Sequence, residues 1–195
     1  TSKQPLLRLH IMRQLSSKLK SLEKILSDMQ SVLIAYSGGT DSTFLLKIAT
    51  TVLGDKAIAV TASSETYTPQ ELLEAKKNAG AIGAQHIIVH TDELNDPNFS
   101  SNPPERCYYC KKELFTKLKV LLARHGLNTI IDGSTCDDER DFRPGMRAVA
   151  EFGVRSPLKE AGFTKEDIRK LSREMNLPTW DKPPLPCLST RFPYG

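Results

Sequence analysis

The sequence predicts an α/β fold in which a doubly wound parallel sheet is flanked by helices. Short continuous apolar runs recur along the chain, beginning with residues 32–36, as expected for strands buried on both faces of a parallel sheet. Segments with apolar residues at helical spacing separate these runs. Because repeated strand–helix units join parallel strands through right-handed crossovers, we expect one sheet with helices on both faces.

The elements can be placed in order along the chain. Apolar residues recur at helical spacing from Leu15 to Met29, so we expect a helix at about residues 11–30 that covers the sheet. Strands are predicted at residues 32–36, 57–62, 87–89 and 128–132, and helices at 43–53, from 68 onward, at 111–124, after Pro144 and at 164–176. Thr68 and Glu71 form a capping box around a proline, and Thr164 is the expected cap of the helix at 164–176. The polar segment 95–106 predicts a loop, and the proline-rich tail 178–195 predicts a structured surface loop.

Length and composition predict one folded, soluble domain. A chain of 195 residues can build one sizeable core, and 39% hydrophobic with 26% charged residues is ordinary globular usage. The net charge of +4 is spread along the chain and suits anionic small molecules as well as nucleic acid. The sequence has no apolar run of the roughly 20 residues that a bilayer requires and no signal-peptide pattern, so we expect a cytoplasmic protein without membrane contact.

The segment Ser37-Gly38-Gly39-Thr40-Asp41-Ser42-Thr43 lies between a predicted buried strand and a predicted helix. Two glycines let the backbone turn sharply and approach an anion, and the amides at the helix start can hold a phosphate. Three hydroxyls add donors, and Asp41 becomes useful if Mg²⁺ lies between it and the phosphates. The segment is neither a Walker A loop, which has a lysine, nor a Rossmann glycine pattern. It resembles the SGGxDS signature of the PP-loop ATP pyrophosphatases, which use the AMP part of ATP to activate a substrate oxygen.

Three cysteines point to sulfur or metal chemistry. Cys107 and Cys110 form a Cys-x-x-Cys motif at the end of the polar loop, before a helix whose N-terminus would lower thiol pKa values. With Cys187 they could hold a [4Fe–4S] cluster with one open iron, or zinc with a further ligand, or remain ordinary thiols. Cys136 is either a fourth ligand or a bystander. Because an adenylated oxygen requires a sulfur nucleophile, the cluster is the favoured interpretation.

From about Leu15 onward the chain resembles the ATP-dependent sacrificial sulfur transferases, the LarE family. The resemblance is carried by residues 37–43, by RCYYCKK at 106–112, by Asp132-Gly133, Asp137-Asp138 and DFRPG at 141–145, and by CLSTRFPYG at 187–195. It implies a role in making the nickel-pincer nucleotide cofactor of lactate racemase. Members adenylate carboxylates of pyridinium-3,5-biscarboxylic acid mononucleotide with Mg-ATP, release pyrophosphate, and then insert sulfur with loss of AMP.

The resemblance also implies a sulfur source. In one subgroup the sulfur comes from a single cysteine, aligned with Cys187, which becomes dehydroalanine. Members with cysteines matching Cys107 and Cys110 resemble a subgroup that binds a [4Fe–4S] cluster and passes on a cluster-bound sulfide. All three cysteines are present here, so the sequence predicts the cluster route, with an upstream sulfide donor that it does not identify.

Roles for individual residues follow from the same resemblance. The expected ATP-binding residues are Ala35, Ser37, Gly38, Gly39, Asp41, Ser42, Thr43, Ala62 and Ser63, with Asp41 also on Mg²⁺. The expected catalytic residues are Cys187, Arg191 and Asp41, and the expected substrate-binding residues are Arg143, Arg191 and Lys112. A guanidinium can grip phosphate or carboxylate bidentately, although either arginine could instead form a surface ion pair. The acids Asp132, Asp137, Asp138 and Asp141 either orient metal or ribose or are merely solvated.

Family members continue beyond the Phe-Pro-Tyr-Gly motif with a smaller region associated with oligomer assembly. We therefore expect residues 1–195 to be the PP-loop domain of a homo-oligomeric protein. Two alternatives are a tRNA thiolase that uses three cluster-binding cysteines and a non-catalytic nucleotide-binding zinc protein. The sequence shows neither a strongly basic face nor an aromatic-rich platform, which argues against a nucleic-acid partner.

Overall fold

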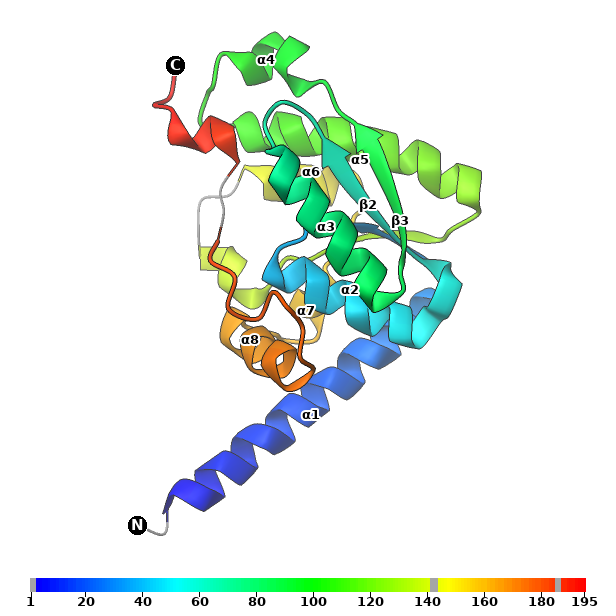
Figure 1. Ribbon diagram of the computed structural model, residues 1–195, viewed down its shortest axis with the longest axis vertical. Coiled ribbons are helices and arrows are strands. Elements are labelled where there is room, and N and C mark those ends of the chain that lie inside the picture. Colours follow the sequence, from blue (N-terminus) through cyan, green and yellow to red (C-terminus); the bar gives the residue numbers. More distant parts are fainter. Residues whose placement is uncertain (1–2, 141–143, 185–186) are drawn as a thin grey trace.

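The computed structural model describes residues 3–140, 144–184 and 187–195, and within them a four-stranded parallel sheet forms the centre (Figure 1). The strands are β1 (Val32–Ala35), β2 (Ala57–Ser63), β3 (Gln85–His90) and β4 (Thr129–Asp132), in the order β3-β2-β1-β4. In the register, Ala35 pairs with Val60 on one side and with Asp132 on the other. The predicted fold class is confirmed.

The strand order reverses at β1. The chain builds outward from β1 through β2 to β3 and then returns to place β4 on the free side of β1. In open α/β sheets, ligands bind outside the carboxyl ends of the strands at such a switch point. The topology therefore brings the segment that follows β1 beside the segment that follows β4.

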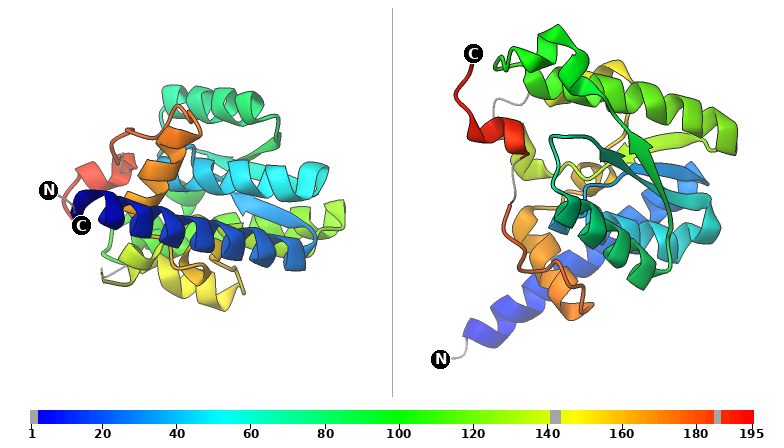
Figure 2. Two further views of the ribbon diagram at one scale, coloured as in Figure 1. Left: turned by 90° about the horizontal axis from the view of Figure 1, so that it is seen from below. Right: turned by 45° about the horizontal axis from the view of Figure 1, so that its top comes forward.

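Helices cover both faces of the sheet (Figure 2). Side chains alternate along β1, so Val32 and Ile34 belong to one core and Leu33 to the other. The first core is built with α1 (Lys3–Met29), α2 (Thr40–Leu53), α3 (Pro69–Ile82), α7 (Pro157–Glu160) and α8 (Lys165–Glu174). The second is built with α5 (Arg106–His125) and α6 (Gly145–Glu151). Phe44 of α2 and Phe163 before α8 meet edge to face, with ring centroids 5.6 Å apart, and tie α8 to the first layer.

Several helices are longer than the sequence predicted. Helix α1 begins at Lys3 rather than near residue 11, and its first turns project beyond the rest of the molecule (Figure 1). Helix α5 begins at Arg106 rather than Lys111.

Two short helices were not predicted. The segment 95–106, predicted as a loop, contains α4 (Pro97–Ser100), because Asp96 caps this turn by accepting from the Asn98 amide and a proline follows it. The other is α7.

The capping predictions at two helices are confirmed. Thr68 and Glu71 form the capping box of α3, and Thr164 forms a second one with Asp167 at α8. The tail has little regular structure in its described part apart from the 3₁₀ turn Leu188–Arg191. Within the described ranges, no helix is both long and apolar enough to cross a membrane.

We predict that α1 contributes to the stability of the domain through one face only. Leu26 is fully buried, whereas Met12 on the same helix is 43% exposed. Leu26→Ala should lower the free energy of unfolding by about 3 kcal/mol, since it leaves a cavity in the core. Met12→Ala should change it by less than about 0.5 kcal/mol. Urea denaturation measures both, and equal effects would contradict packing through a single face.

Candidate nucleotide-binding site

A cavity of about 570 Å³ opens where the carboxyl ends of β1 and β4 meet. This volume lies in the usual range for sites that bind small molecules and cofactors. Its lining comes from the β1–α2 loop, the end of β2, the start of α3, α5, the segment after β4, α8 and the tail. The residues at the switch point thus form a concave site to which seven parts of the chain contribute.

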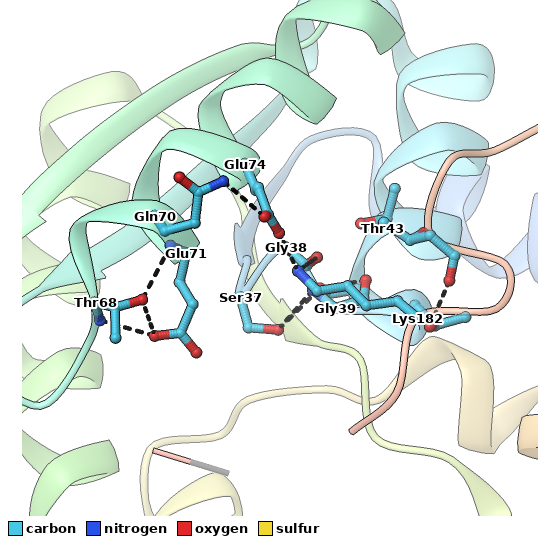
Figure 3. Close-up of polar contacts among 12 residues, drawn as sticks. Ser37, Gly38, Gly39, Thr43, Thr68, Gln70, Glu71, Glu74 and Lys182 are labelled. Atoms are coloured by element: carbon cyan, nitrogen blue, oxygen red, sulfur yellow. Dashed lines mark hydrogen bonds and ion pairs between the residues drawn. The ribbon is translucent and has the colours of Figure 1, made fainter. Parts of the chain in front are cut away.

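The loop after β1 is shaped by contacts that only glycine permits. Gly38 has a φ of +72°, and a Cβ there would lie 2.9 Å from the Cβ of Ala75 on α3. Gly39 is the N-cap of α2, and its amide donates to the Ser37 hydroxyl at 3.3 Å (Figure 3). Because the first turn of α2 lines the cavity, the positive end of its dipole faces the space where an anion would bind.

The segment after β4 approaches the same loop. A Cβ on Gly133 would lie 3.1 Å from the Ser42 nitrogen, so this position also requires close backbone approach. The preceding carboxylate, Asp132, is buried and accepts from the hydroxyls of Ser134 and Ser156, each at 2.7 Å. Lys111 lies 3.4 Å from the same carboxylate. Asp132 is therefore held in a fixed network rather than solvated.

Asp41 is the acidic group in the first turn of α2. Burial raises the pKa of Asp41 to about 6, the charge of Lys165 opposes this, and the charge of Asp138 adds to it. Asp138 is itself buried and lies 3.2 Å from Lys165. Asp137 accepts a hydrogen bond from the Lys165 amide at 2.7 Å. A raised pKa means that the apo site favours neutralisation of Asp41, which a cation would also provide.

Basic side chains also line the cavity. Those that line it are Lys111, Lys165, Arg169 and Lys182. Of the predicted substrate-binding residues, Lys112 and Arg191 are exposed and neither is among the cavity's described lining. The Lys112 ammonium lies 5.9 Å from the centre of the Tyr108 ring instead. Arg143, and with it Asp141, lies outside the described residues.

Known proteins resemble this chain in sequence. No family model matches the chain. It is 41% identical to the pyridinium-3,5-bisthiocarboxylic acid mononucleotide synthase of Lactiplantibacillus plantarum, over 94% of this chain and 67% of that protein. The chain belongs to the LarE family. An uncharacterized protein of Synechocystis sp. is 48% identical over 93% of this chain and 68% of its own length.

Solved structures agree with the fold of this LarE family member. An NMN synthetase from Francisella tularensis superimposes with a TM-score of 0.67 at 15% identity, covering 89% of this chain and 75% of that one. An ammonia-dependent NAD synthetase from Campylobacter jejuni gives 0.60 at 13% identity, covering 86% and 74%. At such low identity these likenesses show that the family shares the fold, and nothing more.

Most of the predicted ATP-binding residues of this LarE chain come together. Those that line the cavity are Ala35, Ser37, Gly39, Asp41, Ser42 and Ala62. Thr43 is fully buried, and its hydroxyl lies 3.3 Å from that of Tyr36, so it supports the loop from the core of the domain. Gly38 packs against α3, and the Ser63 carbonyl accepts from the Thr91 amide. These three shape the site without being part of the described lining.

The four cysteines lie on three segments of the chain, namely α5, the 3₁₀ turn Cys136–Arg140 and the tail. Cys110 lines the cavity, Cys107 lies one turn earlier on α5, and Cys187 is the N-cap of the 3₁₀ turn in the tail. The turn is fixed by a hydrogen bond from the Leu188 amide to the Thr66 carbonyl at 3.1 Å. Cys136 lies in the 3₁₀ turn Cys136–Arg140, and its thiol donates to the Lys159 carbonyl at 3.7 Å.

The expected lowering of the thiol pKa was wrong for Cys110. Burial raises the pKa of this thiol, and the negative charges of Glu93, Cys187 and Cys107 add to the effect. The prediction failed because α5 begins earlier than expected, which places Cys110 beyond the first helical turn and against the cavity wall. Among the described residues, no group of three His, Cys, Asp or Glu side chains is placed to hold a single metal ion.

Sequence reasoning missed several residues that line the cavity. These are Tyr67, Glu71 and Leu72 near the start of α3, Lys165 and Arg169 on α8, and Lys182 in the tail. The sequence identified Glu71 only as a helix cap. Glu71 does cap α3, and it also lines the cavity. Nothing in the sequence marks the three basic residues, because they reach the site only after α8 and the tail pack against α2.

Gly38 offers a test of the loop geometry. Gly38→Ala combines a positive φ with a clash against α3, whereas Gly126 is in the left-handed region with a φ of +63° and no atom within 4 Å of where a Cβ would lie. Gly126→Ala should therefore lower the free energy of unfolding only by the left-handed penalty of about 1–2 kcal/mol. Gly38→Ala should lower the free energy of unfolding by more than this and should also weaken ATP binding. Urea denaturation measures the first effect, and titration calorimetry measures the second. If both variants lost the same free energy of unfolding and Gly38→Ala bound ATP normally, the close approach of the loop to α3 would not shape the site.

Proposed function

We propose that this chain is an ATP-dependent sulfur transferase that converts pyridinium-3,5-biscarboxylic acid mononucleotide into the bisthiocarboxylic acid, for the nickel-pincer nucleotide cofactor of lactate racemase. The observation that carries the proposal is the 41% identity, over 94% of the chain, to a synthase of that bisthiocarboxylic acid mononucleotide. The glycine loop at the mouth of the cavity supports it, because this chemistry requires ATP to be held by its phosphates.

The first step is adenylation. A substrate carboxylate oxygen attacks the α-phosphorus of ATP, the bond between that phosphorus and the α–β bridging oxygen breaks, and pyrophosphate leaves. Ser37, Gly39 and Ser42 are placed to hold the pyrophosphate end, and Ala35 and Ala62 border the part of the cavity assigned to the adenosine. Asp41 is assigned to Mg²⁺, which supplies charge neutralisation at the phosphates when it is bound.

The second step replaces oxygen by sulfur. A sulfur nucleophile attacks the carbonyl carbon of the acyl-adenylate, a C–S bond forms, and the C–O bond to AMP breaks. AMP is a good leaving group because its charge is spread over the phosphate oxygens. Two such rounds convert the two carboxylates of the substrate.

Cys107, Cys110 and Cys187 are assigned to a [4Fe–4S] cluster. Their chemistry fits, since Cys107 and Cys187 both lie close enough to Cys110 to act on it electrostatically and a cluster takes cysteine thiolates as ligands. When bound, such a cluster supplies the sulfide that replaces the oxygen. The alternative source is Cys187 itself, which would lose H₂S and become dehydroalanine. Cys136 is treated as a bystander because its thiol is directed to a backbone carbonyl.

The remaining assignments belong to the same proposal. Arg143, Arg191 and Lys112 are assigned to the phosphate or carboxylates of the mononucleotide, and Arg191 also supports catalysis beside Cys187. Residues 1–195 form the PP-loop domain, the full protein is a cytoplasmic homo-oligomer, and an unidentified donor restores the sulfide.

A pair of cysteine variants tests the sulfur step. Cys187→Ser should still release pyrophosphate from Mg-ATP and the biscarboxylic substrate but should form no thiocarboxylate, because adenylation needs no thiol. Cys136→Ser should retain both activities. Pyrophosphate release and product mass spectrometry on anaerobically prepared protein measure the two steps. Absence of substrate-dependent pyrophosphate release from the unmodified protein would overturn the proposed function.

Analysis of the protein after reaction separates the two sulfur sources. Iron and sulfide near four of each per chain, with an unchanged protein mass, would support the cluster. A loss of about 34 Da, the mass of H₂S, would show that Cys187 is sacrificed. Zinc without iron, with no pyrophosphate release, would favour the non-catalytic zinc protein.

A further inference from the structure

The glycine loop contains no basic residue. Between Ser37 and Thr43 the sequence offers amides, hydroxyls and the carboxylate of Asp41. A Walker A loop, by comparison, carries its own lysine for the β- and γ-phosphates. The triphosphate of ATP is strongly anionic, and the amides of one helix start carry only partial charge. A cationic side chain from elsewhere in the chain would supply, beside Mg²⁺, positive charge that the residues of this loop do not.

The structure places Lys182 at this position. Its ammonium donates to the Gly38 carbonyl at 3.3 Å and to the carboxylate of Glu74 at 3.0 Å (Figure 3). The lysine comes from the tail, 144 residues after Gly38, and its side chain is only 18% exposed. It also lines the nucleotide cavity.

We propose that Lys182 is the phosphate-binding lysine of this site, and that it takes the place of the lysine that a Walker A loop carries. In the apo protein it is held by Glu74 and the Gly38 carbonyl. When ATP binds, the ammonium turns from Glu74 to the β- and γ-phosphate oxygens and stays with the pyrophosphate after adenylation. This inference rests on the proposed function, because it requires ATP at the glycine loop.

The other basic groups of the cavity are less free to change partners. Lys111 and Lys165 pair with the carboxylates of Asp132 and Asp138, and each carboxylate is only 7% exposed. Removing a cation from a buried carboxylate is costly. Glu74, in contrast, is 40% exposed, and ion pairs at the surface contribute little. Glu74 also keeps a second donor, because the amide of Gln70 lies 2.9 Å from its other oxygen.

The backbone around Lys182 is fixed, so only the side chain has to move. The guanidinium of Arg169 donates to the Lys182 carbonyl at 2.8 Å and to the Trp180 carbonyl at 2.9 Å. The Thr40 hydroxyl donates to the Thr179 carbonyl at 2.7 Å, which ties the tail to the first turn of α2. A flexible four-carbon stem on an anchored backbone suits a lysine that changes partner.

Binding measurements on three ligands test the proposal. For Lys182→Met, titration calorimetry on the full chain should show at least about tenfold weaker binding of Mg-ATP and of inorganic pyrophosphate, the usual scale for losing a charge-assisted hydrogen bond. Binding of AMP should stay within about twofold, because AMP lacks the β- and γ-phosphates. Lys20→Met is the matched control, since Lys20 is exposed on α1 and its loss should leave all three affinities unchanged.

Glu74→Gln separates phosphate binding from a merely structural tether. If Lys182 binds phosphate, this variant should bind Mg-ATP as well as the unmodified protein or a few-fold more tightly, because the competing carboxylate is gone. If Lys182 only ties the tail to α3, Glu74→Gln should weaken ATP binding as much as Lys182→Met, and the proposal is wrong. Lys182→Arg should keep most of the affinity for pyrophosphate because it keeps the charge.

The remaining outcomes are also decisive. If Lys182→Met binds Mg-ATP as tightly as the unmodified protein, this inference fails while the proposed function stands. If the unmodified protein does not bind Mg-ATP, both fail. If Lys182→Met does not unfold cooperatively, Lys182→Arg and Glu74→Gln carry the test, and weaker binding of Mg-ATP by Glu74→Gln than by the unmodified protein would overturn the proposal.

Discussion

The contact between Gly38 and Ala75 holds the candidate site together. A left-handed turn directly after β1 lets the loop pass within van der Waals distance of α3, and a side chain at position 38 would push the two apart. This turn sets the direction in which α2 leaves the sheet, and the first turn of α2 then faces the cavity. The anion-binding character of the site depends on this direction, because the amides and the dipole act only along the helix axis.

A second set of contacts completes the site from distant parts of the chain. Arg169 and Thr40 hold the tail by its backbone carbonyls, which is a way of fixing a segment that has little regular structure. The tail in turn brings Lys182 to the glycine loop, and it also carries Cys187. One segment therefore contributes to both the nucleotide loop and the proposed sulfur chemistry.

Charge is distributed unevenly within the cavity. The deeper carboxylates, Asp132 and Asp138, are matched by hydroxyls and by lysines. Burial raises the pKa of Asp41, and the charges of Lys165 and Arg169 offset this only in part. This arrangement supports the proposed binding of Mg-ATP, in which the phosphates would meet the basic groups of the wall and the cation would meet Asp41.

The sequence by itself determined the parallel α/β class, the position of the glycine loop and the helix caps at Thr68 and Thr164, because each depends on residues close together in the chain. The family resemblance of the sequence also assigned Ala35, Ser37 and Ala62 to one site, and all three line the cavity. Only the tertiary structure brought Lys182, Arg169 and Lys165 to the cavity, and only it placed Cys110 in a buried wall. Those positions result from packing between segments that lie far apart in the chain, and no local pattern of residues encodes which side chains such packing will bring together.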